Sequence, residues 1–375
     1  MSGNPFKYGE IVGGSLFCNR QKELKRLHQV FKDGQNIILI SPRRWGKSSL
    51  VNQAIATHKT KLIPVTFDCF GIKSVDDFFQ QYLKACLRAT SSKVSQALDQ
   101  IGDYVGGMSS FLSFSAGEAG EMKIGVSLPK NFKDFSMILD IPNKMAKKKG
   151  LPVVVCVDEF QKLNEIQGGK ELLELLRSVW QKHTNVCYCL YGSKRHLMNL
   201  LFNANGQPFY RFGETIFLDK ISADEWVTFI KETFHDSGLA ISMDVAKKIV
   251  VLAEAHSYYV QLLSRTTWDF TTKTVKAEDV DDAYAQVIND QLLFFRSQTD
   301  RLTKYQVNYI KALVVGETKM TSSRVTKDYD LGTAPNIKRI ETALKDAEII
   351  DYTGDTPAFC EPFFAPLFKK HFMDI

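Results

Sequence analysis

The sequence lacks any long apolar run. No stretch of the chain approaches the roughly 18 consecutive apolar residues that a membrane-spanning helix requires. The N-terminal segment MSGNPFKYGE also lacks the apolar core of a secretory signal peptide. We therefore expect a cytoplasmic protein that has no membrane partner.

The sequence also lacks the cysteine and histidine spacings that are typical of metal sites or of a disulfide framework. The seven cysteines are scattered, with no C-x-x-C pair and no paired histidines. Cys156, Cys187 and Cys189 lie in apolar runs, where reduced cysteines pack as small apolar residues. We expect core thiols rather than a disulfide framework, and no zinc.

Charge of one sign is not in large excess. The chain has 48 Lys and Arg against 42 Asp and Glu, and its net charge of +6 is too mild for a surface dedicated to nucleic acid, although one local basic surface remains open. The Lys147–Lys149 run is expected to be the solvated end of a helix. No internal repeat is present, and a length of 375 residues predicts two or three separate cores.

The first part of the chain alternates between strand-like and helix-like segments. Short apolar, β-branched runs are expected to be strands, and they are separated by segments with helical spacing. The five runs are residues 36–40, 61–70, 151–160, 186–193 and 214–220. This pattern predicts an α/β domain over residues 1–220 with a doubly wound parallel sheet, and a β-hairpin insert around residues 111–128.

The remainder of the chain has a different pattern. Residues 221–295 contain only helical stripes, which predict a helical lid domain. Residues 296–375 begin with three helix-like segments and end in two extended runs around a Gly-Asp turn. That order is typical of a winged-helix domain.

The segment ISPRRWGKSSL follows the first strand and opens a helix. It matches the P-loop pattern G-x-x-x-x-G-K-S/T at Gly46, Lys47 and Ser48, with Ser41 at the first glycine position. We expect backbone amides of residues 43–48 to cradle phosphate oxygens and Lys47 to neutralise the β- and γ-phosphates. The nucleotide-binding residues expected from this segment are Ser41, Pro42, Arg43, Arg44, Trp45, Gly46, Lys47, Ser48 and Ser49.

Two carboxylates end the third strand. Asp158 and Glu159 follow the apolar run 153–157, at the strand end where doubly wound sheets bind ligands. Asp158 together with the Ser48 hydroxyl is expected to hold Mg²⁺, and Glu159 to activate the attacking water as a general base. We assign no catalytic role to Arg43 or Arg44. Instead of binding nucleotide, either arginine could form a salt bridge to Asp158 or Glu159.

Two further polar residues are candidates with open roles. Ser193 ends the fourth strand, where its hydroxyl could sense the γ-phosphate or cap the next helix. Arg211 precedes the fifth strand, where it could reach the nucleotide of a neighbouring subunit or pair with a surface acid. The sequence does not decide between the two roles of Ser193 or between those of Arg211.

Several segments together resemble one known family, the archaeal-type ATPases of the STAND group, which are relatives of AAA+ proteins. The matching segments are FCNRQKELKRL (17–27), SPRRWGKSSL (41–50), VCVDEFQ (155–161), YGS (191–193) and PFYRFGETIFLDKIS (208–222). The resemblance covers almost the whole chain. One departure lies in AEAHSYYVQLL (253–263), which has Ala255 and Ser257 where the family has Gly and Pro.

The resemblance implies a more specific structure and site. It implies strand order 5-1-4-3-2, an adenine pocket near Asn19 and Arg20, and Arg211 at the arginine-finger position, where the side chain acts on a neighbour's γ-phosphate. It also implies ATP with Mg²⁺ as the cofactor, and no guanine-reading N-K-x-D motif is present. Some relatives add a nuclease-like domain, which we do not expect here.

Two functions are compatible with these features. We favour a slow ATPase that acts as a nucleotide-driven switch, binds ATP and ADP, self-associates and engages an unidentified protein. The alternative is a DNA-binding ATPase similar to replication initiators or transposition regulators, with the 335–346 helix in the major groove. Its candidate DNA contacts are Asn336, Lys338, Arg339 and Lys345. Residues 296–375 carry 12 basic and 11 acidic side chains, a balance that disfavours DNA.

Overall fold

The computed structural model describes residues 3–57, 61–90, 112–116, 122–126, 132–353 and 356–373. The chain divides into two compact units, which we call the sheet unit (Ile11–Asp219) and the helical unit (Met1–Glu10 with Lys220–Ile375). The N-terminal residues, which we assigned to the sheet domain, thus group with the helical unit. The reason is that Phe6 is buried there, with its ring centroid 4.9 Å from that of Phe234, and Arg265 donates a hydrogen bond to its carbonyl.

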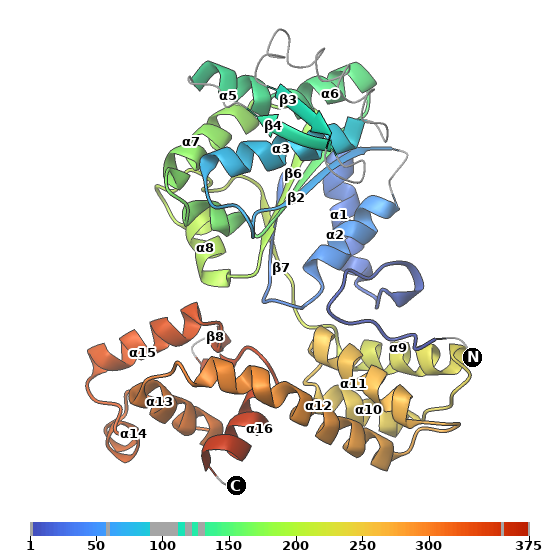
Figure 1. Ribbon diagram of the computed structural model, residues 1–375, viewed down its shortest axis with the longest axis vertical. Helices are drawn as coiled ribbons and strands as arrows, with labels where there is room; N and C mark the ends of the chain where they lie inside the picture. The colour runs from blue at the N-terminus through green and yellow to red at the C-terminus, as the bar shows by residue number, and fades with distance from the viewer. Residues whose placement is uncertain are drawn as a thin grey trace. The chain divides into compact units, whose positions relative to one another are not determined.

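The sheet unit is built on five parallel strands (Figure 1). The strands are β1 (Ile37–Ile40), β2 (Ile63–Asp68), β5 (Val153–Asp158), β6 (Val186–Gly192) and β7 (Glu214–Phe217). Their order is β2-β5-β6-β1-β7. Numbered along the chain and read from the β7 edge, this is 5-1-4-3-2, so the expected order is confirmed.

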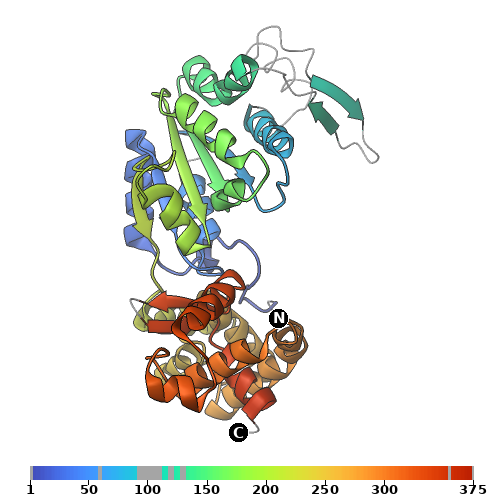
Figure 2. The same ribbon diagram turned by 90° about the vertical axis from the view of Figure 1, so that its left-hand side faces the viewer.

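Helices cover both faces of this sheet (Figure 2). Alternate strand residues point to opposite faces, so Ile37 and Leu39 pack on one side and Ile38 and Ile40 on the other. The first side is covered by α1 (Gln21–Asp33) and α2 (Lys47–Ala56). The second side is covered by α3 (Val75–Thr90), α6 (Ile141–Lys149), α7 (Gly169–Trp180) and α8 (Arg195–Asn203).

Among its described residues, the sheet unit has five further elements. They are η1 (Gly14–Leu16), β3 (Leu112–Ala116), β4 (Met122–Val126), α5 (Phe132–Leu139) and the 3-10 helix η4 (Phe160–Asn164). β3 and β4 pair antiparallel, in the region where we expected a hairpin. Residues 117–121 of the expected hairpin lie outside the described residues.

The helical unit begins with four helices. They are α9 (Ala223–Asp236), α10 (Met243–Leu252), α11 (Ser257–Phe270) and α12 (Ala277–Thr299). α12 continues through the domain limit that we placed between residues 295 and 296. It does so because Phe295 is buried, with its ring 5.2 Å from that of Phe364, so that the end of α12 belongs to the following core.

The C-terminal part of the helical unit consists of helices and one antiparallel strand pair. Its elements are α13 (Lys304–Val315), α14 (Ser323–Asp328), α15 (Ala334–Asp346), β8 (Ile350–Thr353), β9 (Thr356–Phe359), α16 (Phe364–Phe368) and η5 (Lys369–Met373). We did not predict the last two. The expected Gly-Asp turn lies outside the described residues. In the described part of the chain, no helix combines the length and apolar character that a membrane span needs.

The departure at Ala255 has a local structural consequence. Glu254 and Ala255 both adopt left-handed backbone conformations, with φ of 48° and 53°. Glycine enters this region without steric cost, whereas an alanine is strained there. The position therefore favours the glycine that the family pattern has, and α11 begins two residues later at Ser257.

Candidate active site

The ends of several parallel strands bring the candidate residues together. Because the strands are parallel, their carboxyl ends share one edge of the sheet. Ser41 follows β1, Asp158 ends β5 and Ser193 follows β6. Asp68, which we did not predict, ends β2 and lies opposite Asp158 in the strand register. In the sequence, its signal was an acidic residue at the end of an apolar, strand-like run.

The backbone of the 41–48 loop explains which glycine it needs. Gly46 has a φ of 91°, and a Cβ built there would have no atom within 4 Å, so its conformation and not its packing requires glycine. Ser41 is outside the left-handed region, so a side chain is accommodated without strain. Its hydroxyl lies 3.1 Å from the Pro42 carbonyl oxygen, to which it donates a hydrogen bond. Replacement of the first glycine by serine is therefore structurally neutral.

Lys47 lies where the 41–48 loop passes into α2. Its side chain is buried, and its Nζ donates hydrogen bonds to the Ser41 carbonyl at 3.0 Å and the Pro42 carbonyl at 3.1 Å. It is also the first residue of α2, whose first turn offers backbone N–H groups to an anion. A positive ammonium and a helix N-terminus thus occur at the same place, which is chemistry suited to phosphate.

The loop and β5 meet through a short hydrogen bond. Ser48 Oγ donates to Asp158 Oδ2 at 2.6 Å. Burial raises the pKa of Asp158 to about 6, and the Glu159 charge adds to this, while the Ser48 hydrogen bond and the Lys47 charge oppose it. A hydroxyl and a carboxylate oxygen at this distance form a hard-oxygen pair that fits Mg²⁺, which takes few protein ligands and completes its shell with water and phosphate.

The Ser48–Asp158 pair supplies two protein oxygens. Within the described ranges, no group of three or more His, Cys, Asp or Glu side chains is arranged to hold a metal ion. A divalent cation held by the Ser48–Asp158 pair would take its other ligands from water and nucleotide phosphates.

Glu159 is held by two donors. Its Oε2 accepts a hydrogen bond from Ser193 Oγ at 2.9 Å and a second from Gln161 Nε2. Its backbone is left-handed, with φ 49° and ψ 39°. Ser193 does not cap α8, because the N-cap of that helix is Lys194, and the Ser193 hydroxyl donates to Glu159 instead. A contact of Ser193 with the γ-phosphate stays a prediction. Sequence reasoning missed Gln161, although it belongs to the VCVDEFQ segment.

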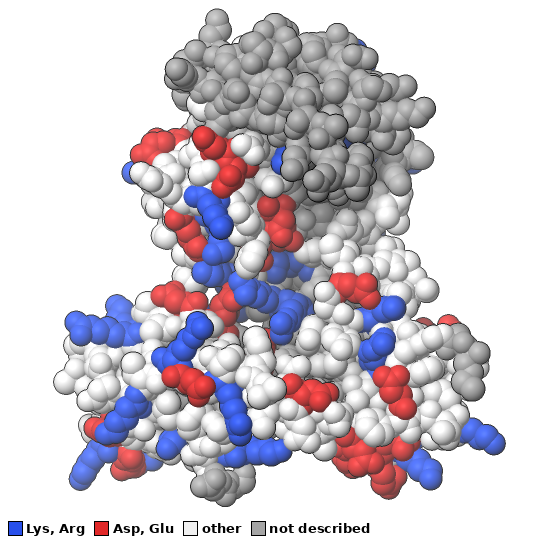
Figure 3. All heavy atoms as spheres, in the orientation of Figure 1, with Lys and Arg blue, Asp and Glu red and all other residues white. Residues whose placement is uncertain are grey.

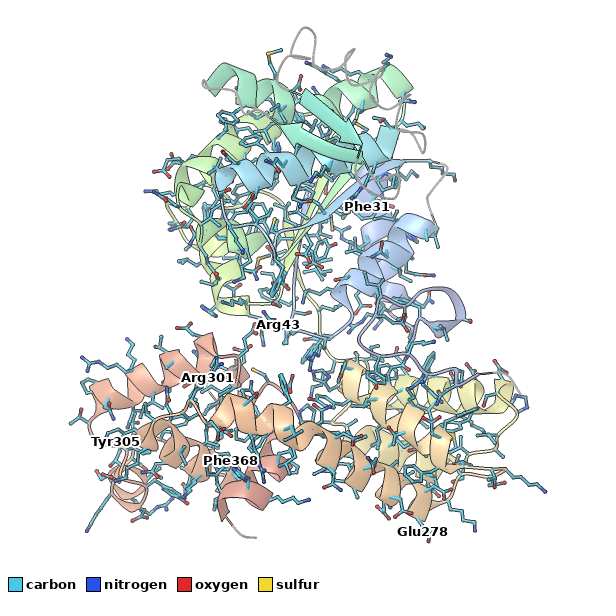
Figure 4. All side chains as sticks on the ribbon, in the orientation of Figure 1. Phe31, Arg43, Glu278, Arg301, Tyr305 and Phe368 are labelled. Atoms are coloured by element: carbon cyan, nitrogen blue, oxygen red, sulfur yellow. The ribbon has the colours of Figure 1, made fainter. Side chains whose placement is uncertain are left out.

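Arg43 lies at the same edge of the sheet (Figure 4). Its Nε donates to Ser193 Oγ at 3.4 Å, and its guanidinium carbon lies 6.0 Å from the centre of the exposed Phe70 ring. Arg43 is therefore connected through Ser193 to Glu159. Arg44 has a φ of 61° and an exposed side chain.

The Asn19–Arg20 segment supports the loop directly. Arg20 is buried, and its guanidinium donates to the Trp45 carbonyl at 3.1 Å and to Glu23 Oε1 at 3.2 Å. The Asn19 side chain accepts from the backbone N–H of Gln21 at 3.3 Å. These contacts tie the start of α1 to the 41–48 loop. The adenine pocket near Asn19 and Arg20 stays a prediction.

Arg211 is exposed just before β7. Its guanidinium carbon lies 5.2 Å from the centre of the Tyr210 ring, and its φ is 50°. It forms no ion pair with any residue in the described ranges, so the surface acid that we considered as its partner is not found among them.

These features define a P-loop ATPase, and comparison with known proteins supports that class. A family model for the ATPase domain found predominantly in Archaea matches residues 17–248. The chain belongs to this family. It is an ATPase, which hydrolyses ATP to ADP and phosphate. Among curated protein sequences, none shows significant similarity to the chain.

Solved structures show the same fold. The Walker-type ATPase PABY2304 of Pyrococcus abyssi is 16% identical with a TM-score of 0.71, over 97% of this chain and 99% of that one. The ORC2 protein of Aeropyrum pernix, in its ADPNP–ADP complexes, is 11% identical with a TM-score of 0.61, over 94% of each chain. The ADP form of the latter is 12% identical with a TM-score of 0.56, over 98% of this chain and 95% of that one.

Proposed function

We propose that this ATPase is a nucleotide-driven switch of the STAND group, which binds Mg-ATP at the 41–49 loop and hydrolyses it slowly. The single observation that carries the proposal is the hydrogen bond between Ser48 and Asp158, because it joins the loop to the strand end that bears the carboxylates. Bound Mg²⁺ would supply charge neutralisation between the β- and γ-phosphates. Ser48 and Asp158 would hold it.

The other residues have distinct proposed roles. Lys47 exchanges its two carbonyl partners for phosphate oxygens, and the amides at the start of α2 bind the remaining oxygens. Glu159 takes a proton from the attacking water. Arg211 acts on the γ-phosphate of a neighbouring subunit, so turnover depends on self-association. Without that arginine the site binds ATP but turns it over slowly.

The helical unit supplies the proposed output of the switch. We assign α9–α12 to a helical lid and α13–α15 with β8 and β9 to a winged helix, because three helices followed by a strand pair have the order of that fold. ATP and ADP would favour different arrangements of these elements, since only ATP carries the γ-phosphate. The partner engaged by the winged helix is proposed to be a protein.

A DNA-reading role for α15 is disfavoured by its internal contacts. Asn336 Nδ2 donates to the Leu331 carbonyl at 2.8 Å, and Lys345 Nζ lies 3.9 Å from the centre of the Tyr352 ring. Two of the four candidate DNA contacts are thus engaged within the unit. On the face shown in Figure 3, basic and acidic side chains are also interspersed over the C-terminal segment and form no single basic stripe.

The switch is tested by hydrogen exchange on the Glu159→Gln protein with Mg-ATP and with Mg-ADP. We expect peptides from residues 220–373 to exchange differently in the two nucleotides, and the same peptides of Lys47→Ala to show no nucleotide effect. Identical exchange in both nucleotides throughout residues 220–373, while peptides around residues 41–49 show that each is bound, would contradict the switch.

The DNA alternative is tested by salt-dependent binding to duplex DNA. We expect little binding at physiological salt and no change on Lys338→Ala with Arg339→Ala. A sub-micromolar complex whose salt slope falls by roughly one unit per removed phosphate contact would instead establish the DNA-binding function.

A further inference from the structure

We propose that Gln161 is a positioning residue for ATP hydrolysis: its side-chain amide, packed against Gly192, fixes one oxygen of Glu159 so that the other oxygen is presented to the attacking water. The inference rests on the proposed role of Glu159 as the general base. It identifies the residues that orient the Glu159 carboxylate.

The backbone at Glu159 is already constrained. With φ 49° and ψ 39°, the residue is in the left-handed region, which costs a residue with a Cβ conformational energy. Strain of this kind persists where the surrounding structure determines it, and it is concentrated at functional sites. The strained backbone fixes the direction in which the Glu159 side chain leaves the end of β5.

Two donors then fix the carboxylate. Gln161 Nε2 and Ser193 Oγ both donate to Glu159 Oε2. Oε1 of Glu159 accepts no hydrogen bond from any residue in the described part of the chain. A carboxylate anchored at one oxygen loses most of its torsional freedom, so the second oxygen keeps one direction for accepting a proton.

The state of the Gln161 amide supports a positioning role. Gln161 is fully buried, and its Oε1 has no hydrogen-bond partner among the described residues. An unsatisfied buried amide oxygen is costly and requires an explanation. The opposite orientation of the amide would place its oxygen against the Glu159 carboxylate, where two acceptors repel. The orientation that leaves Oε1 unsatisfied is thus the one that gives Glu159 its donor.

Gly192 makes room for this amide. A Cβ built on Gly192 would lie 1.9 Å from Gln161 Oε1 and 2.9 Å from Met198 Sδ. Gly192 does not have a positive φ, so space is what excludes a side chain there. Even an alanine at this position would displace the amide, and Glu159 would lose one of its two donors.

The experiment compares Gln161→Leu and Gly192→Ala with Gln29→Leu, the same chemical change at an exposed site on α1. Steady-state turnover, ATP affinity and thermal unfolding are measured for each. We expect both site variants to lower kcat by about 10- to 100-fold, as a displaced catalytic group does, with ATP affinity changed less than about threefold. Gln161→Leu should also unfold at the wild-type temperature or above it, because it removes an unsatisfied buried amide. Gln29→Leu should turn over normally.

A double-mutant comparison separates positioning from simple core packing. If Gln161 acts through Glu159, adding Gln161→Leu to Glu159→Gln should change the residual turnover by less than about twofold. An equal loss in both backgrounds, or full turnover by Gln161→Leu alone, would overturn the inference. If Glu159→Gln itself is fully active, the role of Glu159 as the base fails. If Glu159→Gln is inactive and Gln161→Leu is fully active, only the inference about Gln161 fails.

Discussion

Ser48 Oγ lies 2.6 Å from Asp158 Oδ2, and this hydrogen bond joins the start of α2 to the end of β5. The two residues are 110 positions apart in the chain, yet each lies at the same edge of the parallel sheet. The contact places the hydroxyl and the carboxylate where one cation could bind both. Asp158 is a partly buried acid that is followed directly by a second carboxylate, Glu159, and its ionisation therefore affects stability.

Asp158→Asn should stabilise the nucleotide-free protein at neutral pH. Folding raises the pKa of Asp158 from 3.8 to about 6, chiefly by burial. The folded state therefore binds the proton more tightly than the unfolded state does. Stability conferred by the neutral acid is full below pH 4 and is lost as the pH rises through 6. A shift of two pKa units changes the free energy of unfolding by at most about 3 kcal/mol.

The measurement is urea unfolding of both proteins in EDTA between pH 4 and pH 8. The stabilisation by Asp158→Asn should be largest above pH 7 and small at pH 4. Asp236→Asn removes a carboxylate that is 83% exposed and should leave stability nearly unchanged at every pH. A stability difference for Asp158→Asn that does not vary with pH would show that its ionisation is not what destabilises the protein.

Arg20→Ala should weaken nucleotide binding without changing the preference for the base. Arg20 donates to the Trp45 carbonyl, so its loss loosens the phosphate loop, which contacts the part that ATP and GTP have in common. We expect both affinities to fall by a similar factor of about 10, since a hydrogen bond from a charged group contributes about 1.5–3 kcal/mol. Affinities from fluorescent-nucleotide competition check this. If ATP binding falls far more than GTP binding, Arg20 reads the adenine as the family resemblance implies.

The strands and the 41–48 loop were predictable because each has a local sequence pattern. The strand order was expected from the family resemblance. Apolar runs mark buried strands, and Gly46, Lys47 and Ser48 have fixed spacing. The contacts of Gln161 were not predictable from spacing. They depend on how η4 packs against β6, where Gly192 leaves room for the amide.

Two other structural features could not be predicted from local sequence patterns. The buried Arg20 reaches a carbonyl 25 residues away, and no periodicity reports such a contact. The continuation of α12 past residue 295 depends on the aromatic contact between Phe295 and Phe364, which are far apart in the sequence. Both are decided by tertiary packing.

Arg211→Ala should bind ATP normally but lose the dependence of turnover on protein concentration. An arginine supplied by a neighbouring subunit stabilises the transition state and can increase turnover by about 10³-fold or more. Turnover per subunit of the unmodified protein should therefore rise with concentration, and that of Arg211→Ala should stay low. Steady-state ATPase assays over a dilution series give this comparison, with association followed by light scattering.

Mixing shows whether Arg211 acts between subunits. Arg211→Ala retains an intact phosphate loop and Glu159, while Glu159→Gln retains Arg211, so a mixture of these two inactive proteins should regain turnover. If the mixture stays as inactive as its components while both proteins are folded and associate, then Arg211 does not act across an interface.

The most direct test of the whole account is turnover and ATP affinity of Glu159→Gln in Mg²⁺, measured beside Lys47→Ala. The amide keeps the shape of the side chain and removes the base, so we expect ATP affinity within about threefold of the unmodified protein and kcat lower by about 10²- to 10⁴-fold. Lys47→Ala should instead lose ATP binding itself. Full ATPase activity in Glu159→Gln would contradict the assignment of this site.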